Sequence, residues 1–390
     1  MFSLLLAIIY MAFISLGLPD SLIGAAWPVM QSDLNTPLSY AGALTLIIGI
    51  GTIISSLWAD RLIQKIKTGP LTAICVTLTA VALFGFSISS SFILLCIFAI
   101  PYGLGAGAID AALNNYVALH YSSRHMSWLH AFWGVGVTIS PNIMSYCLSN
   151  QYGWQMGFGS VAVLQIILAI IMFISLPLWK KHEKQNLNNQ HKEKRNVLTI
   201  KQVFKLKGAP FVLIAFFIFC AAETTAGLWA SSFLVECKNI DENTAALCAA
   251  LFYFGETSGR FINGFVADKF GDKIMVRVGI IIMIIGSLFV LLPININIFA
   301  FIGLIILGLG AAPIYPCIIH STPTNFGSDN SQSMMGVMVA SAYVGATVMP
   351  VVFGTIAQYI SIALYPAYLL ILSVLMIILT EKLNKTIKIA

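Results

Sequence analysis

Long apolar segments alternate with short polar ones along the whole chain. A helix needs about 20 predominantly apolar residues to cross a bilayer. Residues 180–207 form the one long hydrophilic stretch, which we interpret as a linker between two sets of six apolar segments. The pattern predicts twelve membrane spans, at 3–30, 37–58, 69–89, 92–119, 126–148, 155–179, 209–236, 244–267, 275–293, 296–319, 332–358 and 362–381.

The composition favours a membrane protein and argues against an enzyme. Hydrophobic residues make up 58% of the chain and charged residues 9%, with a mean hydropathy of +0.90. The seven cysteines show no metal-binding spacing. No phosphate-binding loop, HExxH motif or nucleophile elbow occurs, so we expect neither catalysis nor a cofactor. The apolar N-terminus lacks a basic region and a small-residue cleavage site, and we interpret it as a retained first helix.

The positions of Lys and Arg predict the orientation in the membrane. Of the 21 basic residues, only Lys238 falls in a loop on one side, and only Arg260 falls well inside a predicted span, since Arg277 is at the very start of the span 275–293. The others lie in the loops, linker and tail of the opposite side, which the positive-inside rule makes cytoplasmic. We therefore expect a multi-pass protein of the cytoplasmic (inner) membrane with both termini in the cytoplasm. This distribution also accounts for the net charge of +6 without a nucleic-acid partner.

Motifs of the first half recur in the second half in the same order. The offsets between the paired motifs are nearly constant, and Asp20 and Glu223 are related by a similar offset of 203 residues. Such a repeat indicates duplication, and it predicts bundles at 1–179 and 208–390 joined by the basic linker 180–207. The motif pairs are GTIISSLWADRLIQK (51–65) with GRFINGFVADKFGDK (259–273), GLGAGAIDAALNN (103–115) with GLGAAPIYPCIIH (308–320), and VGVTISP (135–141) with VGATVMP (344–350).

The duplicated loop motif resembles a known signature. ADRLIQK (59–65) and ADKFGDK (267–273), each preceded by small residues, resemble the loop signature of the major facilitator superfamily. The resemblance implies an all-α membrane protein with 12 transmembrane helices in two pseudo-symmetric six-helix bundles. It also implies that these loops latch the cytoplasmic side, whereas the alternative is ordinary interfacial anchoring. The residues expected to take part in gating are Asp60, Arg61, Asp268, Lys269 and, toward the same side, Arg260.

Four acidic side chains interrupt apolar segments: Asp20, Asp110, Glu223 and Glu256. A charged side chain at the centre of a bilayer costs about 3 kcal/mol on insertion scales, so each acid is a candidate functional group. A carboxyl group that is protonated on one side of the membrane and ionised on the other can couple proton movement to transport. The alternative for each acid is a structural hydrogen bond to a neighbouring helix, or a place in a solvated vestibule.

Two of these acids fall in segments that resemble one branch of the superfamily. FAIPYGLGAGAIDAALNNYVAL and WLHAFWGVGVTISP are similar to the fucose:proton symporter branch. That branch has a coupling carboxylate in span 4, where Asp110 replaces the usual Glu, and an acidic residue in span 1, where Asp20 fits. The resemblance implies that Asp20 and Asp110 couple transport to protons. It is also carried by Asn114, His130, Gly134, Gly136 and Pro141.

Polar and aromatic groups at mid-membrane depth are the predicted substrate contacts. Asn114 follows Asp110 by four residues and shares its helix face, and Glu256 and Arg260 have the same spacing and are expected to pair. Trp229 offers an aromatic platform for a sugar, or belongs to the aromatic belt at the membrane surface. The set predicted to contact substrate is Asn114, Glu223, Thr224, Trp229, Tyr343 and Glu256.

These features predict a monomeric secondary carrier that imports a small polar, sugar-like solute with protons by alternating access. Sodium coupling stays open, because carboxylates and Thr hydroxyls also ligate Na⁺. A drug or metabolite exporter is a second class, in which Glu223 and Asp20 would bind cationic substrates and a wide apolar cavity is expected. A transport-derived receptor or lipid flippase is a third, which a lateral hydrophobic groove would favour.

Overall fold

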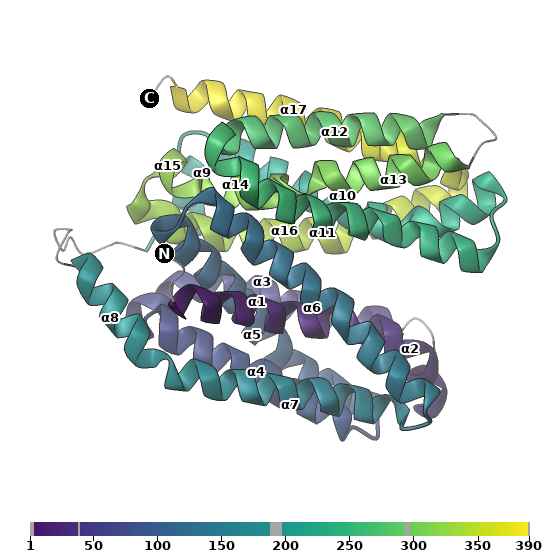
Figure 1. Cartoon of the computed structure of the whole chain (residues 1–390), viewed down its shortest axis with the longest axis horizontal. Coiled ribbons are helices and arrows are strands. Elements are labelled where there is room, and N and C mark those ends of the chain that lie inside the picture. The colour runs from purple at the N-terminus through teal and green to yellow at the C-terminus, as the bar shows by residue number, and fades with distance from the viewer. Residues whose placement is uncertain (1–3, 38–39, 188–196, 293–296, 389–390) are drawn as a thin grey trace. The chain divides into compact units, whose positions relative to one another are not determined.

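The computed structural model describes residues 4–37, 40–187, 197–292 and 297–388 (Figure 1). Every regular element in these ranges is helical, and they contain no strand. Part of the predicted linker, residues 188–196, lies outside the described residues. An all-helical chain is what a bilayer demands, because a helix satisfies its own backbone hydrogen bonds where no water is present.

The helices follow the apolar segments of the sequence. In the first half they are α1 (Leu4–Asp20), α2 (Leu22–Asp33), α3 (Tyr40–Ile66), α4 (Thr68–Ser87), α5 (Phe92–His120), α6 (Ser123–Ser149), α7 (Gly153–Ile174) and α8 (Leu176–Leu187). In the second half they are α9 (Ile200–Lys205), α10 (Ala209–Lys238), α11 (Glu242–Phe270), α12 (Asp272–Leu291), α13 (Ile298–Ala311), α14 (Ile314–His320), α15 (Thr322–Phe326), α16 (Ser328–Ile356), the short η1 (Ala357–Ser361) and η2 (Ile362–Leu364), and α17 (Tyr365–Lys388).

All twelve predicted spans correspond to helices. Within the described residues, 9 helical stretches are long and apolar enough to cross a membrane, and one of these, 328–387, contains both predicted spans 11 and 12. The remaining two spans are α6 and α11, which carry more polar side chains than the others, including His130 in α6 and Glu256 and Arg260 in α11. Candidate site residues therefore lie both on these two more polar helices and on apolar ones such as α1, α5 and α10.

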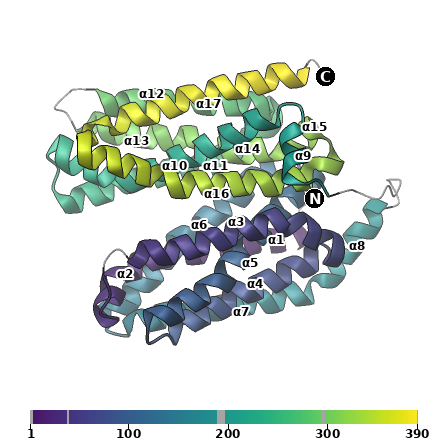
Figure 2. The same cartoon turned by 180° about the vertical axis from the view of Figure 1, so that it is seen from behind.

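Contacts divide the chain into two compact units. Unit 1 comprises residues 1–116 and 132–197, and unit 2 comprises residues 117–131 and 198–390. In unit 1, α4 packs against α7, and in unit 2, α10 packs against α16 while α12 packs against α13 (Figures 1 and 2). This division differs from the sequence-based bundles at residues 117–131, the end of α5 and the start of α6, whose contacts lie with the second half.

Two equivalent glycines reveal the repeat at the level of single contacts. A Cβ placed on Gly136 of α6 would overlap the carbonyl oxygen of Ile14 in α1. A Cβ placed on Gly345 of α16 would overlap the carbonyl oxygen of Phe217 in α10 in the same way. Ile14 and Phe217 are 203 residues apart, the offset that also relates Asp20 to Glu223. The two bundles are therefore pseudo-symmetric, and Asp20 and Glu223 occupy equivalent positions on equivalent helices.

The first span is broken next to Asp20, and the break has a local cause. Pro19 has no N–H to donate to the carbonyl of Ser15, one turn earlier in α1. Gln165 of α7 supplies the missing donor from Nε2, and its Oε1 accepts the Ser15 hydroxyl at 2.9 Å. Beyond the break, the hydroxyl of Ser21 donates to the carbonyl of Val137 at 2.8 Å. The helix ends at Asp20 and restarts at Leu22, leaving the carboxylate at the junction.

Candidate functional site

Asp20 is held by two side-chain donors within unit 1. The hydroxyl of Tyr102, on α5, donates to Oδ1 at 2.7 Å, and the indole Nε1 of Trp133, on α6, donates to Oδ2 at 2.9 Å. The Asp20 side chain is nevertheless exposed. A carboxylate with both oxygens oriented by neutral donors and one face open can accept further hydrogen bonds from a solute. Two aromatic rings beside it provide apolar surface of the kind that sugar rings pack against.

Asp110 has a different environment from Asp20. It is 5% exposed, and Asn114, fully buried one turn later on α5, donates from Nδ2 to its Oδ1 at 2.6 Å. This hydrogen bond joins two side chains that the four-residue spacing places on one helix face. Tyr102 and Asp110 are eight residues apart on α5, which separates them by about 12 Å along the helix axis. Of the two acids predicted to couple protons, Asp20 thus lies at the surface of unit 1 and Asp110 in its core.

Three ionisable side chains of unit 2 form one cluster on α10 and α11. Nη2 of Arg260 donates to Oε1 of Glu223 at 2.9 Å and also to Oε1 of Glu256. Arg260 and Glu256 are each 2% exposed, whereas Glu223 is partly exposed. The predicted pairing of Glu256 with Arg260 is confirmed, and Glu223 joins the pair from the neighbouring helix.

The other predicted substrate contacts have mixed surroundings. The indole N–H of Trp229 donates to the carbonyl of Pro350 in α16 at 3.1 Å, and its ring lies edge-on against Phe353 with centroids 5.7 Å apart. Its polar atom is therefore occupied within the bundle. Thr224 on α10 and Tyr343 on α16 are both half-buried. The role of these three residues in substrate binding stays a prediction.

The two loop motifs have unequal environments despite their repeat relationship. Asp60 is 3% exposed near the end of α3, while Arg61 beside it is exposed. Asp268, in the last turn of α11, is more open, with 30% of its side chain exposed. Lys269 extends over the ring of Phe270, with Nζ 5.6 Å from the ring centroid. The gating role of these residues stays a prediction.

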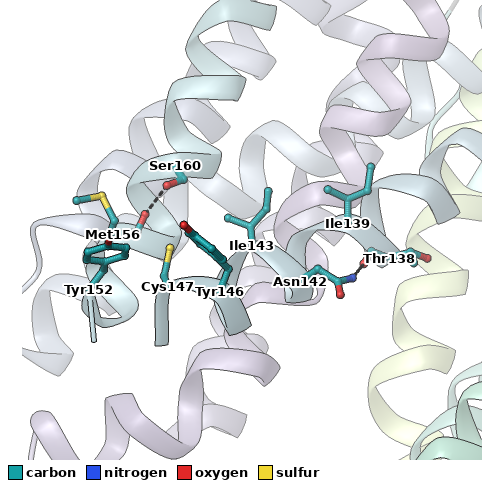
Figure 3. A pocket seen from close by; sticks show the side chains of 9 residues that line it. All are labelled: Thr138, Ile139, Asn142, Ile143, Tyr146, Cys147, Tyr152, Met156 and Ser160. Atoms are coloured by element: carbon teal, nitrogen blue, oxygen red, sulfur yellow. Dashed lines mark hydrogen bonds between the residues drawn. The ribbon is translucent and has the colours of Figure 1, made fainter. Parts of the chain in front are cut away.

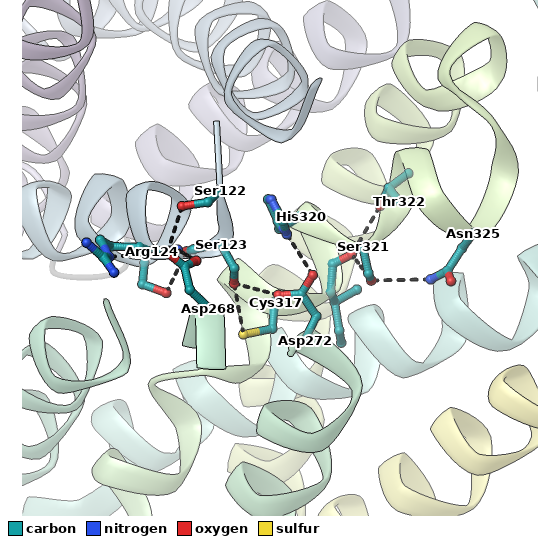
Figure 4. A network of polar contacts seen from close by, with 12 residues as sticks. Ser122, Ser123, Arg124, Asp268, Asp272, Cys317, His320, Ser321, Thr322 and Asn325 are labelled. Atoms are coloured by element: carbon teal, nitrogen blue, oxygen red, sulfur yellow. Dashed lines mark hydrogen bonds and ion pairs between the residues drawn. The ribbon is translucent and has the colours of Figure 1, made fainter. Parts of the chain in front are cut away.

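A polar network within unit 2 fixes the start of α6 (Figure 4). Asp268 accepts hydrogen bonds from the hydroxyl of Ser122 at 3.0 Å and from the backbone N–H of Arg124 at 2.9 Å. It also pairs with Nε of Arg124 at 3.2 Å. Asp272, at the start of α12, accepts a hydrogen bond from the hydroxyl of Ser123 at 2.5 Å. Two acids at the junction of α11 and α12 therefore bind residues 122–124, between α5 and α6.

His320 closes this network from α14. Its Nδ1 faces Oδ2 of Asp272 at 2.6 Å, and its Nε2 faces the carbonyl oxygen of Tyr121 at 3.0 Å. Both ring nitrogens therefore face acceptors, and the doubly protonated imidazole satisfies both contacts. The network joins three segments that are distant in sequence, which is the arrangement expected of a latch.

A surface pocket of about 580 Å³ lies on α6 and α7 of unit 1, and none of the four acids lines it (Figure 3). Its lining is largely apolar, and two of its polar side chains donate to carbonyls of their own helices. Asn142 donates to the carbonyl of Thr138 at 2.7 Å, and Ser160 donates to the carbonyl of Met156 at 2.8 Å. Such a lining suits an acyl chain or another apolar molecule better than a polar solute. The lining residues are Thr138, Ile139, Asn142, Ile143, Tyr146, Cys147, Tyr152, Met156 and Ser160.

Sequence reasoning missed the donors to Asp20 and most of the polar network around Asp268 and Asp272. Tyr102 belongs to the same four-residue series on α5 as Asp110 and Asn114, and that spacing could have identified it. Trp133 lies within a motif already singled out for its His and Gly residues. Asp272 and His320 lie within the repeat motifs 259–273 and 308–320, but their contact could not be predicted, because it joins helices whose relative rotation the sequence pattern does not specify.

Comparisons with known proteins bear on this geometry. The sequence profile of the Major Facilitator Superfamily matches residues 9–237 and 212–383. A relative from Saccharomyces cerevisiae, Bypass of stop codon protein 6, is 24% identical over 91% of this chain and 77% of its own length. The glucose/mannose transporter GlcP of Bacillus subtilis is 20% identical over 97% of this chain and 94% of its own length.

Solved structures share the fold at low sequence identity. FucP, a transporter of this superfamily solved in the outward conformation, has a TM-score of 0.80 at 14% identity, with 98% of both chains covered. XylE, a proton:xylose symporter, has a TM-score of 0.79 at 13% identity, with 98% of this chain and 95% of that chain covered. With a profile match over most of its length and the duplicated helical bundles described above, this chain belongs to the major facilitator superfamily of membrane transporters.

Proposed function

We propose that the protein is a proton-coupled importer of a small, sugar-like solute that works by alternating access. The observation that carries the proposal is Asp20, an exposed carboxylate at a break in the first span, oriented by Tyr102 and Trp133. Carboxylates accept hydrogen bonds from sugar hydroxyls, and aromatic rings pack on the apolar faces of sugars. The transport of glucose and mannose by GlcP, and of xylose by XylE, supports the same substrate class.

The division of roles follows the surroundings of each acid. Asp20 is open to a solute and exchanges protons with water, whereas Asp110 is buried beside Asn114 and would act as an internal proton acceptor. Substrate contacts are assigned to Asn114 in unit 1 and to Glu223, Thr224, Trp229, Tyr343 and Glu256 in unit 2. Gating is assigned to Asp60, Arg61, Arg260, Asp268 and Lys269, of which Asp268 holds the start of α6.

Membrane placement follows the positive-inside distribution of Lys and Arg. The protein would lie in the cytoplasmic membrane as a monomer, with both termini in the cytoplasm. Protons are the proposed coupling ions and no other cofactor is assigned.

The test is uptake by full-length protein in proteoliposomes. A panel of labelled hexoses, pentoses and deoxysugars is offered under an imposed pH gradient, and in parallel under a sodium gradient at equal pH. We expect at least one sugar to accumulate only under the pH gradient. Accumulation driven by sodium would show that Na⁺, rather than the proton, is the coupling ion. If no sugar accumulates under either gradient, the protein is not a sugar importer.

The apolar pocket on α6 and α7 favours a second candidate function. A groove of this lining fits an exporter of apolar compounds or a lipid flippase better than it fits a sugar carrier. The same liposomes distinguish the sugar importer from the exporter or flippase, because an exporter or flippase would move a fluorescent lipid or a lipophilic cation outward without any sugar. A Tyr146→Trp change, which adds bulk to the lining of the pocket, would reduce such movement and leave sugar uptake unaffected.

A further inference from the structure

The cluster of Glu223, Glu256 and Arg260 carries more acid than base. One guanidinium nitrogen, Nη2 of Arg260, donates to an Oε1 atom of each carboxyl group, at 2.9 Å for Glu223. The two carboxyl groups therefore face the same guanidinium nitrogen. Two ionised carboxylates have only acceptor atoms and cannot hydrogen-bond to each other, whereas a carboxylic acid can donate to a carboxylate. The geometry therefore suits a pair of carboxyl groups that has one proton between them.

Charge counting leads to the same conclusion. With both acids ionised and Arg260 protonated, the cluster has a net charge of −1. Arg260 and Glu256 are each 2% exposed, and both lie on α11, one of the twelve predicted spans. An uncompensated charge at such a place is expensive, and it persists only where a partner neutralises it. One additional unit of positive charge is needed, and it must reach the acids from the side on which Glu223 is partly exposed.

The neighbouring ionisable groups do not supply that charge. Tyr253, one turn before Glu256 on α11, packs its hydroxyl against Gly227 of α10, and Tyr365 of α17 donates to the carbonyl of Ala226 at 2.8 Å. Both are neutral phenols. On α16 the nearest ionisable residue along the helix is Tyr343, and α13 has no ionisable residue in its sequence.

His130 of α6 is the further group that could become positive among the described residues around the cluster. It is 6% exposed, and its ring packs on Tyr315 of α14 with centroids 4.6 Å apart. A charge in such a buried place would lose its hydration. The additional positive charge must therefore come from an ion that enters the cluster.

We propose that Glu223 and Glu256 together bind one proton, making this cluster a proton site in the second bundle that is separate from Asp20 and Asp110. On loading, an O–H bond forms on one carboxyl oxygen, and Arg260 neutralises the other carboxylate. On release, that O–H bond breaks and the proton leaves to water through Glu223. Arg260 acts as a positioning residue that keeps the two acids together.

A proton fits this site better than a sodium ion does. Na⁺ must be surrounded by several oxygen ligands, but the guanidinium already occupies the position that both Oε1 atoms face. A metal cation placed there would lie directly beside a positive charge. A proton needs no such space. The use of the proton for transport rests on the proposed function, whereas its binding to the cluster does not.

The experiment measures protonated carboxyl groups directly in the full-length protein, without a substrate. Attenuated-total-reflection infrared spectra of protein in liposomes are recorded at neutral pH, and the C=O stretching band of carboxylic acids is integrated. We expect Glu223→Gln and Glu256→Gln each to remove the area of one carboxyl group, because the remaining acid then pairs one-to-one with Arg260. Arg260→Gln should add the area of one group, since both acids then become protonated. Glu236→Gln, at an exposed position near the end of α10, is the matched control and should change nothing.

Each outcome decides the proposal. If neither single Glu variant changes the band, both acids are ionised and the proposal is wrong. If adding Na⁺ at constant pH removes the band in the wild type, the site takes a metal cation rather than a proton alone. Should Arg260→Gln fail to fold, as judged by size-exclusion chromatography, the two Glu variants decide on their own. A failure of all sugars in the uptake assay with an intact carboxyl band would refute the importer while leaving the proton site in place.

Discussion

The hydroxyl of Tyr102 donates to the carboxylate of Asp20 at 2.7 Å, across 82 residues of sequence. This bond links the break in the first span to α5, the helix that also carries Asp110 two turns further on. Trp133 links the same carboxylate to α6. Asp20 is therefore oriented by two helices of its own unit before any solute arrives, which lowers the cost of fixing it when a solute binds.

Removing either donor should weaken substrate binding. Tyr102→Phe and Trp133→Phe each delete one hydrogen bond to a charged oxygen, a loss of about 1.5–3 kcal/mol. We expect the KM of proton-driven uptake to rise at least about tenfold in each variant, with a smaller change in the maximal rate. Tyr146→Phe, an exposed tyrosine of α6 outside this contact, is the control and should behave as wild type. An unchanged KM in both variants would mean that Asp20 does not bind the solute.

Neutralising the coupling acids should separate accumulation from exchange. Asp110→Asn keeps a side chain of the same size that can still pair with Asn114, but it can no longer take up a proton. We expect uptake driven by a pH gradient to be lost while exchange of labelled for unlabelled sugar across the membrane continues. Asp20→Asn should impair both, because Asp20 is also assigned to the solute. Full gradient-driven accumulation in Asp110→Asn would make that residue structural.

The sequence predicted what depends on local spacing and missed what depends on helix rotation. The spans, the repeat and the pairs Asp110–Asn114 and Glu256–Arg260 all follow from patterns within one segment. The contact of Glu223 with Arg260 joins two helices over 37 residues of sequence. A helix that is apolar on most of its faces does not indicate which face meets which neighbour, because lipid and a packed helix favour the same side chains.

The repeat also shows how equivalent positions have diverged. Offset by 205 residues, Asp110 of unit 1 corresponds to Tyr315 of unit 2, and offset by 208 residues, Arg260 corresponds to Thr52. The scaffold contacts at Gly136 and Gly345 are nonetheless preserved. In unit 1 the acids Asp20 and Asp110 thus have neutral hydrogen-bond partners. In unit 2 the acids Glu223 and Glu256 both pair with Arg260. A sequence repeat predicts the scaffold well, but the chemistry at each position must be read from the side chains themselves.

Gln165 should contribute measurably to stability because it replaces a hydrogen bond that Pro19 cannot make. In Gln165→Leu, the carbonyl and the hydroxyl of Ser15 both lose their partner in a buried place. We expect a destabilisation of about 1–3 kcal/mol, seen as a lower melting temperature of the purified protein in detergent. Ser15→Ala removes the hydroxyl but leaves the carbonyl contact, so its effect should be smaller. Equal melting temperatures for Gln165→Leu and the wild type would contradict this account of the break.

Asp268 should control how firmly the start of α6 is held. In Asp268→Asn the ion pair with Arg124 is lost, and the amide cannot accept on both sides as the carboxylate does. We expect a cysteine placed at Ser122 to react faster with a polar maleimide in the Asp268→Asn background than in the wild-type background. Asp241→Asn, which changes a carboxylate at the opposite end of α11, is the matched control and should leave this rate unchanged. If Asp268→Asn gives the same labelling rate as the wild type, the network around Asp268 does not act as a latch and the gating assignment of this residue is wrong.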